Sequence, residues 1–391
     1  MLARCRDFER CEEALQDAGL EALDAWRASG VPRNPAAWLT VTARRRLVDR
    51  LRRERLGAQA LAQLGAELDD ASADEQQPDD PLEDERLRLF FTCCHPALAP
   101  EAQVALLLNA VCGLEAPDIA RAFLVADATL AQRLVRAKRK VREAGIPFRV
   151  PAPELLAQRL PNVLAAIYLV YNEGHAAARG RELVRADLCA EAVRLARLVT
   201  ALLEDEPEAR GLLALLLLHE SRRTARTDAA GVLVPLEEQD RNLWDRVAID
   251  EAVAHLERAL RLRRVGPYQL QAAIAAVHAE ARSAQETDWR QIVLLYGELF
   301  AVEPSPVVAL NRAVAVAMAD GPDAGLRELA PVERAGELAS YPYLQAVKAD
   351  LLRRAGRLAE AAVAYERALG LTRNGTERGY LRARLAACRA T

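Results

Sequence analysis

Residues 113–142, GLEAPDIARAFLVADATLAQRLVRAKRKVR, decide the fold of this chain. Their spacing predicts a short helix from about Ala116 to Phe123 and, after a tight turn, a second helix that begins near Asp127. Asp127 can accept a hydrogen bond from the free amides of the first helical turn, so we predict that it is the N-cap. The apolar residues that recur at helical spacing in the second helix are Leu130, Leu134, Val135 and Val141.

The opposite face of the second helix is polar and cationic. It carries Thr129, Gln132, Arg133, Arg136, Arg139 and Lys140. Between residues 121 and 142 there are seven basic residues and one acid. Two helices locked by a small apolar face, with an exposed basic second helix, are typical of a helix-turn-helix that enters a DNA major groove. The alternative is an amphipathic hairpin with a solvated basic face; because the capped turn, the short first helix and the charge sign agree, we predict DNA binding.

The composition predicts an all-α protein with segregated charge. Of the 391 residues, 51% are hydrophobic but only 5% are aromatic, and alanine, leucine and arginine predominate. The net charge of −3 excludes a uniformly basic nucleic-acid binder. However, residues 44–55 hold seven arginines, and residues 66–85 hold ten acids and no base. Segregation of this kind indicates local binding surfaces.

Nothing in the sequence indicates a targeting segment, a membrane span or a cofactor. Residues 1–3, Met-Leu-Ala, run directly into charged residues, which predicts no signal peptide, and no stretch approaches the roughly 20 apolar residues of a span. The seven cysteines are odd in number and scattered, so we predict reduced thiols in a cytoplasmic protein. Residues 93–95, Cys-Cys-His, lack the paired spacing of a zinc site, and we predict no metal and no cofactor.

Two helices are expected near the N-terminus. For the first, Phe8–Arg27, the predicted buried stripe is Leu15, Ala18, Ala22, Leu23 and Trp26. The second spans Pro35–Arg55, with Asn34 as its cap and Pro35 at its first position.

The arginines of this second helix outnumber its two acids, Asp49 and Glu54. We therefore predict an uncompensated cationic face, which suits phosphates because releasing their counterions supplies affinity. Trp38 and Thr40 lie at the less charged start of the helix. Trp38 could stack on an unpaired base or belong to the core, and the sequence favours neither.

Two long stretches carry a family resemblance. Residues 32–54, PRNPAAWLTVTARRRLVDRLRRE, resemble the second region of extracytoplasmic-function (ECF) sigma factors of bacterial RNA polymerase, and residues 84–151 resemble their fourth region. FTCCHPAL, LAAIYLVYNEGH and EEQDRNLWD are similar to the subgroup with a long helical C-terminal extension. The resemblance covers essentially the whole chain. It implies a sigma factor that directs transcription initiation, with core RNA polymerase and promoter DNA as partners.

The resemblance also implies roles for individual residues. The helix over Ala128–Arg142 would read the −35 element through Thr129, Gln132, Arg133, Arg136, Arg139 and Lys140. The helix over Ala37–Arg55 would recognise and melt the −10 element through Trp38, Thr40, Arg44, Arg45, Arg46 and Arg50. The first helix would dock on polymerase through Glu13, Gln16, Asp17 and Glu21. Two departures stand out: family members have about another helix before this start, and Arg45 replaces an asparagine that many of them have.

The predicted organisation has four parts. They are an apparently shortened sigma region 2 (1–56), an acidic linker (57–82), sigma region 4 with the helix-turn-helix (83–149) and a helical extension (150–391). In residues 342–375, Ala349, Gly356, Ala361, Tyr365 and Ala368 fall on the small and aromatic positions of a tetratricopeptide (TPR) repeat. Such repeats stack into a concave surface, so we predict a TPR-like extension with a protein or peptide ligand; a plain helical bundle is the alternative.

Enzymatic activity is not expected. Residues 173–175 (Glu-Gly-His) and 219–220 (His-Glu) contain groups capable of acid–base work, but without a nucleophile, phosphate loop or metal triad a buried polar network is the simpler role. The competing function is a helix-turn-helix regulator with a TPR-type sensor that does not join polymerase. Such a regulator has no need of the arginine-rich helix over residues 35–55, which favours the sigma factor.

Overall fold

The computed structural model describes residues 5, 7–53, 85–111, 113–122, 125–149, 151, 153–175, 185–228 and 231–390. These residues confirm the all-α prediction: they form no β-strand, and their only β-pairing is an isolated bridge between Thr227 and Leu233. The predicted acidic linker and Phe123 lie outside the described residues. None of the described helices is both long enough and apolar enough to cross a membrane.

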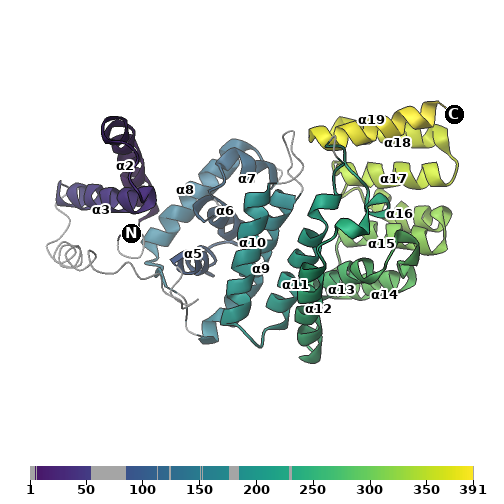
Figure 1. The fold of residues 1–391 in the computed structure, drawn as a ribbon, viewed down its shortest axis with the longest axis horizontal. Helices are drawn as coiled ribbons and strands as arrows, with labels where there is room; N and C mark the ends of the chain where they lie inside the picture. The colour runs from purple at the N-terminus through teal and green to yellow at the C-terminus, as the bar shows by residue number, and fades with distance from the viewer. Residues whose placement is uncertain are drawn as a thin grey trace. The chain divides into compact units, whose positions relative to one another are not determined.

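The chain divides into two compact units, Met1–Ala166 and Ile167–Thr391. The first contains helices α2 (Phe8–Ser29) and α3 (Pro35–Arg53), which form a hairpin (Figure 1). The Asn34 side chain accepts a hydrogen bond from the Ala37 amide at 3.0 Å, which confirms the predicted cap of α3.

The core of this hairpin differs from the predicted stripe. Leu15 and Leu23 are 48% and 59% exposed, and the buried residues of α2 are instead Phe8, Cys11, Ala14, Ala18 and Ala22. Phe8 packs against Phe148, with ring centroids 5.4 Å apart, and the other four are small side chains, which let α2 and α3 approach closely. Helical spacing predicts that the two leucines point inward, but they lie outside the face of α2 that packs against α3.

Four further helices of the first unit are α5 (Glu85–Cys93), α6 (Pro100–Ala110), α7 (Ala116–Ala122) and α8 (Asp127–Glu143). Helices α7 and α8 are the predicted helix pair, and both pack against α6. Ile119 and Ala120 of α7 and Leu130 and Leu134 of α8 are buried, as predicted.

Two details of this pair correct the prediction. Asp127 is the first residue of α8, and the N-cap is Ala126, which has no side chain to accept a hydrogen bond. Asp127 instead contributes negative charge to the first turn, where the helix dipole favours it. Val135 is 55% exposed, whereas Ala137 is buried in its place, because only a narrow stripe of α8 faces α6 and α7.

Beyond residue 150 the chain is a succession of helices. They are α9 (Pro153–His175), α10 (Ala186–Leu202), α11 (Pro207–Ser221), α12 (Arg246–Arg261), α13 (Pro267–Glu280), α14 (Trp289–Val302), α15 (Pro306–Asp320), α16 (Pro322–Ala335), α17 (Pro342–Arg354), α18 (Leu358–Leu371) and α19 (Gly375–Arg389). From α10 onward each helix packs against the next in the chain. The division between the two units falls inside α9, after the predicted start of the extension.

The α17–α18 hairpin contains the residues that suggested a repeat. Ala349, Ala361, Tyr365 and Ala368 are all buried in one apolar cluster. Gly356 joins the two helices with a φ of +76°, a left-handed conformation that favours glycine. Small residues at the contact and a glycine in the turn explain how the two helices pack closely.

We expect Gly356→Ala to lower the free energy of unfolding by about 1–2 kcal/mol, because an alanine at positive φ is strained even where its Cβ meets no atom. Gly379→Ala is the matched control: this glycine lies within α19 with open space around it, so alanine should stabilise the helix by roughly 0.5–1 kcal/mol. Urea unfolding of the two variants should give shifts of opposite sign, and a neutral Gly356→Ala would contradict the strain.

Candidate nucleic-acid interface

The polar face of α8 borders a shallow groove of about 400 Å³. Five of the six residues predicted to read the −35 element line it: Thr129, Gln132, Arg133, Arg136 and Lys140. The opposite wall comes from Ala97, Leu98, Ala99 and Ala102. The sixth predicted residue, Arg139, does not line the groove, and its Nε lies 3.7 Å from Oε1 of Glu143.

The wall of this groove is held in place by buried polar contacts. Gln103, 2% exposed, donates from Nε2 to the carbonyl oxygens of His95 at 3.0 Å and Leu98 at 2.9 Å. These bonds fix the turn that leads into α6. Sequence reasoning missed the turn as part of the site; prolines 96 and 100, which bracket it, were the available signal.

The chemistry of the groove suits a nucleic acid. Arginine guanidinium groups can donate two parallel hydrogen bonds to a guanine edge, and glutamine can pair with adenine in the same way. On α8, Gln132 and Arg136 are exposed and Arg133 is half-buried. The helix therefore presents both types of base-reading side chain on one face, next to Lys140, which can contact a phosphate.

Three arginines of α3 have acidic partners, contrary to the prediction of an uncompensated cationic face. Both Arg45 and Arg46 contact Glu21 of α2, at 2.9 Å and 2.6 Å respectively. Arg50 pairs with Glu13 and, at 3.0 Å, with Asp17. The prediction counted only acids within α3, whereas the compensating acids lie on the neighbouring helix.

The three acids in these ion pairs belong to the set predicted to contact polymerase. Glu13, Asp17 and Glu21 face α3, while Gln16, the fourth member, is exposed. The structure thus brings the predicted polymerase contacts together with the predicted −10 contacts, along one seam between α2 and α3.

The other three residues predicted to contact the −10 element also lie on α3, but they take no part in the ion pairs with α2. Trp38 is half-buried and packs edge-on against Trp26, with ring centroids 5.6 Å apart, so it belongs partly to the core. Thr40 is exposed, and its hydroxyl donates to the Ala36 carbonyl at 2.8 Å. Arg44 is half-buried and makes no ion pair with any residue that the structure describes.

Helix α2 also contacts α8, which the sequence did not predict. Lys138 Nζ lies 2.6 Å from Oε1 of Glu12. Arg142 lies 3.4 Å from carboxylate oxygens of both Asp7 and Glu9, and its hydrogen bond to Asp7 raises the pKa of the guanidinium. Part of the basic charge on α8 is therefore compensated by α2, on the side away from the groove.

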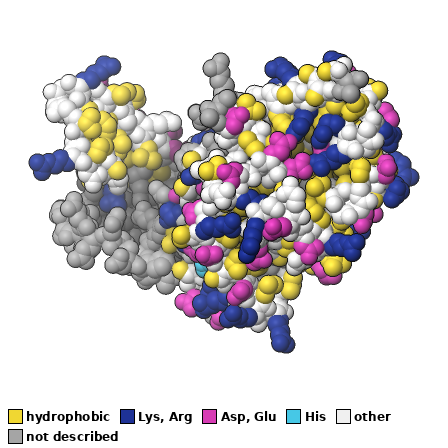
Figure 2. Space-filling model, turned by 45° about the vertical axis from the view of Figure 1, so that its right-hand side comes forward, with side chains coloured by type: hydrophobic (Ala, Val, Ile, Leu, Met, Phe, Trp, Pro, Cys, Tyr) yellow, Lys and Arg dark blue, Asp and Glu magenta, His cyan; other side chains and the backbone are white. Residues whose placement is uncertain are grey.

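Apolar side chains remain exposed on the α2–α3 hairpin. They are Leu15, Leu20, Leu23, Val31 and Val41. Figure 2 shows apolar side chains gathered on this part of the chain. A contiguous exposed apolar area of this kind marks an interaction surface.

The two cysteines of the Cys-Cys-His sequence belong to the core, whereas His95 is half-buried. Cys93 and Cys94 are buried, and burial raises the pKa of the Cys94 thiol to about 12. His95 accepts a hydrogen bond from the Ala97 amide through Nδ1 at 3.1 Å. Across the described residues there is no group of three or more His, Cys, Asp or Glu side chains placed to hold a metal.

Comparison with models of known protein families identifies the family of this chain. Residues 1–56 match the model of sigma-70 region 2, and residues 91–141 match that of sigma-70 region 4. The chain belongs to the sigma-70 family. This sigma factor directs promoter recognition and transcription initiation, and its partners are core RNA polymerase and promoter DNA. The sigma-70 family consists of transcription factors without enzymatic activity.

The remainder of the sigma factor carries a separate match. Residues 159–260 match a family of unknown function, DUF6596. The sigma factor is also 47% identical over 389 residues to an uncharacterized protein, R00370, of Rhizobium meliloti (strain 1021), covering 98% of this chain and 91% of the relative. No solved structure matches the sigma factor.

Proposed function

We propose that α8 of this sigma factor reads the −35 element of its promoters, and that the protein is a cytoplasmic member of the ECF subgroup. The observation that carries the first part is the groove along α8, where Gln132, Arg133 and Arg136 meet Thr129 and Lys140. Their donors match base edges and phosphates. Two of the basic residues on the other side of α8, Lys138 and Arg142, pair with Glu12 and Glu9 of α2.

The α2–α3 hairpin is proposed to perform two tasks. Arg44, Arg45, Arg46 and Arg50 would contact and help to melt the −10 element, with Trp38 and Thr40 at the start of α3. Core polymerase would bind α2, where exposed Leu15 and Gln16 lie between the acids Glu13 and Asp17. When promoter DNA and polymerase both bind, the ion pairs between α2 and α3 would break, or their charged groups would contact the two partners as well.

The extension is proposed to support the two sigma regions, without catalytic activity of its own. Consecutive helices that pack in chain order, and the α17–α18 hairpin with its buried small residues, support a TPR-like array that binds a protein or peptide. The histidine-containing segments form a polar network, in which the Tyr171 hydroxyl donates to Glu220 at 3.1 Å and lies 3.3 Å from His175 Nδ1.

Run-off transcription tests the proposal directly. The full chain is mixed with core polymerase and a library of promoter fragments that vary at both elements. We expect transcripts from a subset of sequences, with a preference at −35 that changes when Gln132 is replaced by alanine. Binding of fragments without any transcription in the presence of polymerase would contradict the assignment.

Replacing Arg44, Arg46 and Arg50 with alanine should weaken open-complex formation more than −35 binding, because these residues are proposed to act where strands separate. Permanganate footprinting of the −10 region measures the first step, and a mobility shift measures the second. The single variant Arg44→Ala is the control for this triple variant, since it removes an arginine without breaking an ion pair to α2. Equal loss at both steps would show that these arginines only hold duplex DNA.

A further inference from the structure

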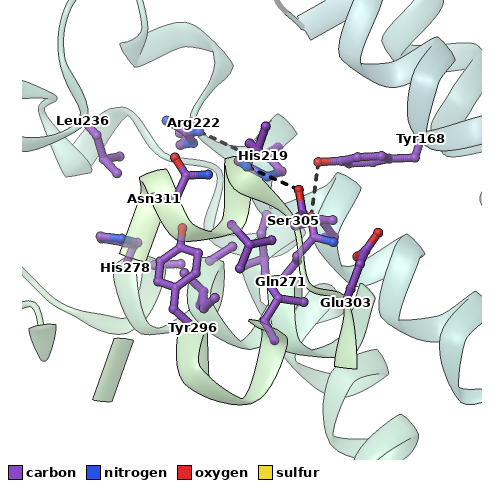
Figure 3. Close-up of a pocket in the computed structure, with 18 of the residues that line it drawn as sticks. Tyr168, His219, Arg222, Leu236, Gln271, His278, Tyr296, Glu303, Ser305 and Asn311 are labelled. Carbon is purple, nitrogen blue, oxygen red and sulfur yellow. Dashed lines mark hydrogen bonds between the residues drawn. The ribbon is translucent and has the colours of Figure 1, made fainter. Parts of the chain in front are cut away.

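The second unit contains a pocket of about 400 Å³ that the sigma function does not use (Figure 3). It lies among α11, α13, α14 and α15, with Tyr168 of α9 beside them. Leu215, Leu218, Ile274 and Leu299 supply apolar walls. This size falls within the range of pockets that hold small organic molecules, about 300–1,000 Å³.

One positively charged side chain of this pocket has no acidic partner among the described residues. Arg222 lines the pocket and makes no ion pair with the residues that the structure describes. Its NH2 group lies 3.1 Å from Nδ1 of His219, and Figure 3 shows the two side chains next to each other. Burial, together with the charge of Arg226, lowers the pKa of Arg222 to about 10, so the guanidinium stays charged at neutral pH.

The histidines of the pocket do not add charge. Burial lowers the pKa of His219 well below its usual value, with Arg222 as the next largest cause. Burial and the charge of Arg222 lower the pKa of His278 to about 4. Both rings are therefore neutral at pH 7, and Arg222 is the single positive charge among the described lining residues.

Two ring nitrogens at the pocket lack a hydrogen-bond partner within the described part of the chain. Trp244 is only 4% exposed, and its Nε1–H has no acceptor. His278 Nδ1 is likewise buried and unpartnered. Leaving such groups unsatisfied costs about 1–3 kcal/mol each, so the residues around the pocket include polar groups that the described protein atoms do not satisfy.

We propose that this pocket binds a small organic monocarboxylate, with the carboxylate on Arg222 and the apolar body against the leucine and isoleucine walls. A carboxylate matches the guanidinium fork and carries the one negative charge that Arg222 can neutralise. Asn311, which also lines the pocket, supplies a further donor. A phosphate dianion is disfavoured because no second cation lines the pocket, and because Glu303 lies at the opposite side from Arg222 in Figure 3.

Thermal unfolding of the full chain tests the proposal, with benzoate as the probe and benzamide as its uncharged analogue. We expect millimolar benzoate to raise the transition temperature by about 2–4 °C, and benzamide or inorganic phosphate to give no shift. The same shift with benzamide would show hydrophobic binding only and overturn the proposal. So would the absence of a shift with benzoate, acetate and isovalerate alike.

Two variants and a control place the binding at Arg222. Arg222→Gln should abolish the benzoate shift, whereas Arg261→Gln, at a position 77% exposed on α12, should keep it. Asn311→Asp provides a second variant in case Arg222→Gln does not fold. The new carboxylate should take the place of the ligand carboxylate beside Arg222. The transition temperature of the free protein should therefore rise, and the response to benzoate should disappear. A benzoate shift that persists in both variants would overturn the assignment.

Discussion

Replacing Arg133 and Arg136 together with alanine is expected to reduce affinity for promoter DNA by at least one and up to several orders of magnitude, because a bidentate arginine–guanine contact contributes about 1–3 kcal/mol. Both residues line the groove along α8, one turn apart. Quantitative footprinting at fixed salt measures the loss, and a library selection shows whether preference at −35 is relaxed.

Arg139→Ala is the matched control for this experiment. It removes one positive charge from the same helix, half of what the double variant removes, but Arg139 lies outside the groove and beside Glu143. Its loss should be smaller and uniform across sequences, as expected for a residue near phosphates. If the double variant keeps the wild-type affinity and sequence preference, α8 is not the reading helix.

Truncation after Val150 should abolish most transcription in vitro. Part of α9 belongs to the first unit, where Arg159 donates to the Phe91 carbonyl at 3.2 Å. Leu160, Val163 and Leu164 of this helix are buried. Removing them exposes apolar side chains of the first unit that they cover, so region 4 should lose stability. The truncated protein also lacks the proposed support from the extension.

A second truncation, after Ala166, separates these two effects. It keeps Arg159 and the buried residues that follow it, and it removes the second unit alone. Recovery of transcription would show that the first truncation acts by uncovering region 4. Loss in both would show that residues 167–391 are themselves required. Unchanged transcription and solubility after either cut would contradict a supporting role.

The sequence predicts best what depends on neighbours along the chain. The cationic face of α8 and its buried Leu130 and Leu134 follow from helical periodicity, and the structure agrees. Val135 shows the limit: periodicity cannot give the width of the covered stripe, because this width depends on α6 and α7. The same reason explains why Leu15, a large apolar side chain, is exposed while Ala14 beside it is buried.

Contacts between distant residues could not be predicted from the pattern. Arg46 and Glu21 are 25 positions apart, and Lys138 and Glu12 are 126 apart. The sequence of each helix alone predicts charged side chains that face solvent. The ion pairs between the helices follow only from the way the helices pack. The Arg222 pocket has the same origin, since five helices contribute to its lining.

The seam between α2 and α3 has a consequence for how the protein meets DNA. Arg46 already holds Glu21 through two nitrogens, at 2.9 and 2.6 Å, so the rotamers of its long side chain are fixed during folding rather than at the promoter. The proposed contact of Arg46 with a backbone phosphate would then exchange one anion for another. Glu21 would keep its second partner in this exchange, because Arg45 lies 2.9 Å from its other carboxylate oxygen. In the proposed mode of binding, promoter DNA would therefore release one of the two arginines that hold Glu21, and this acid would become more accessible to polymerase.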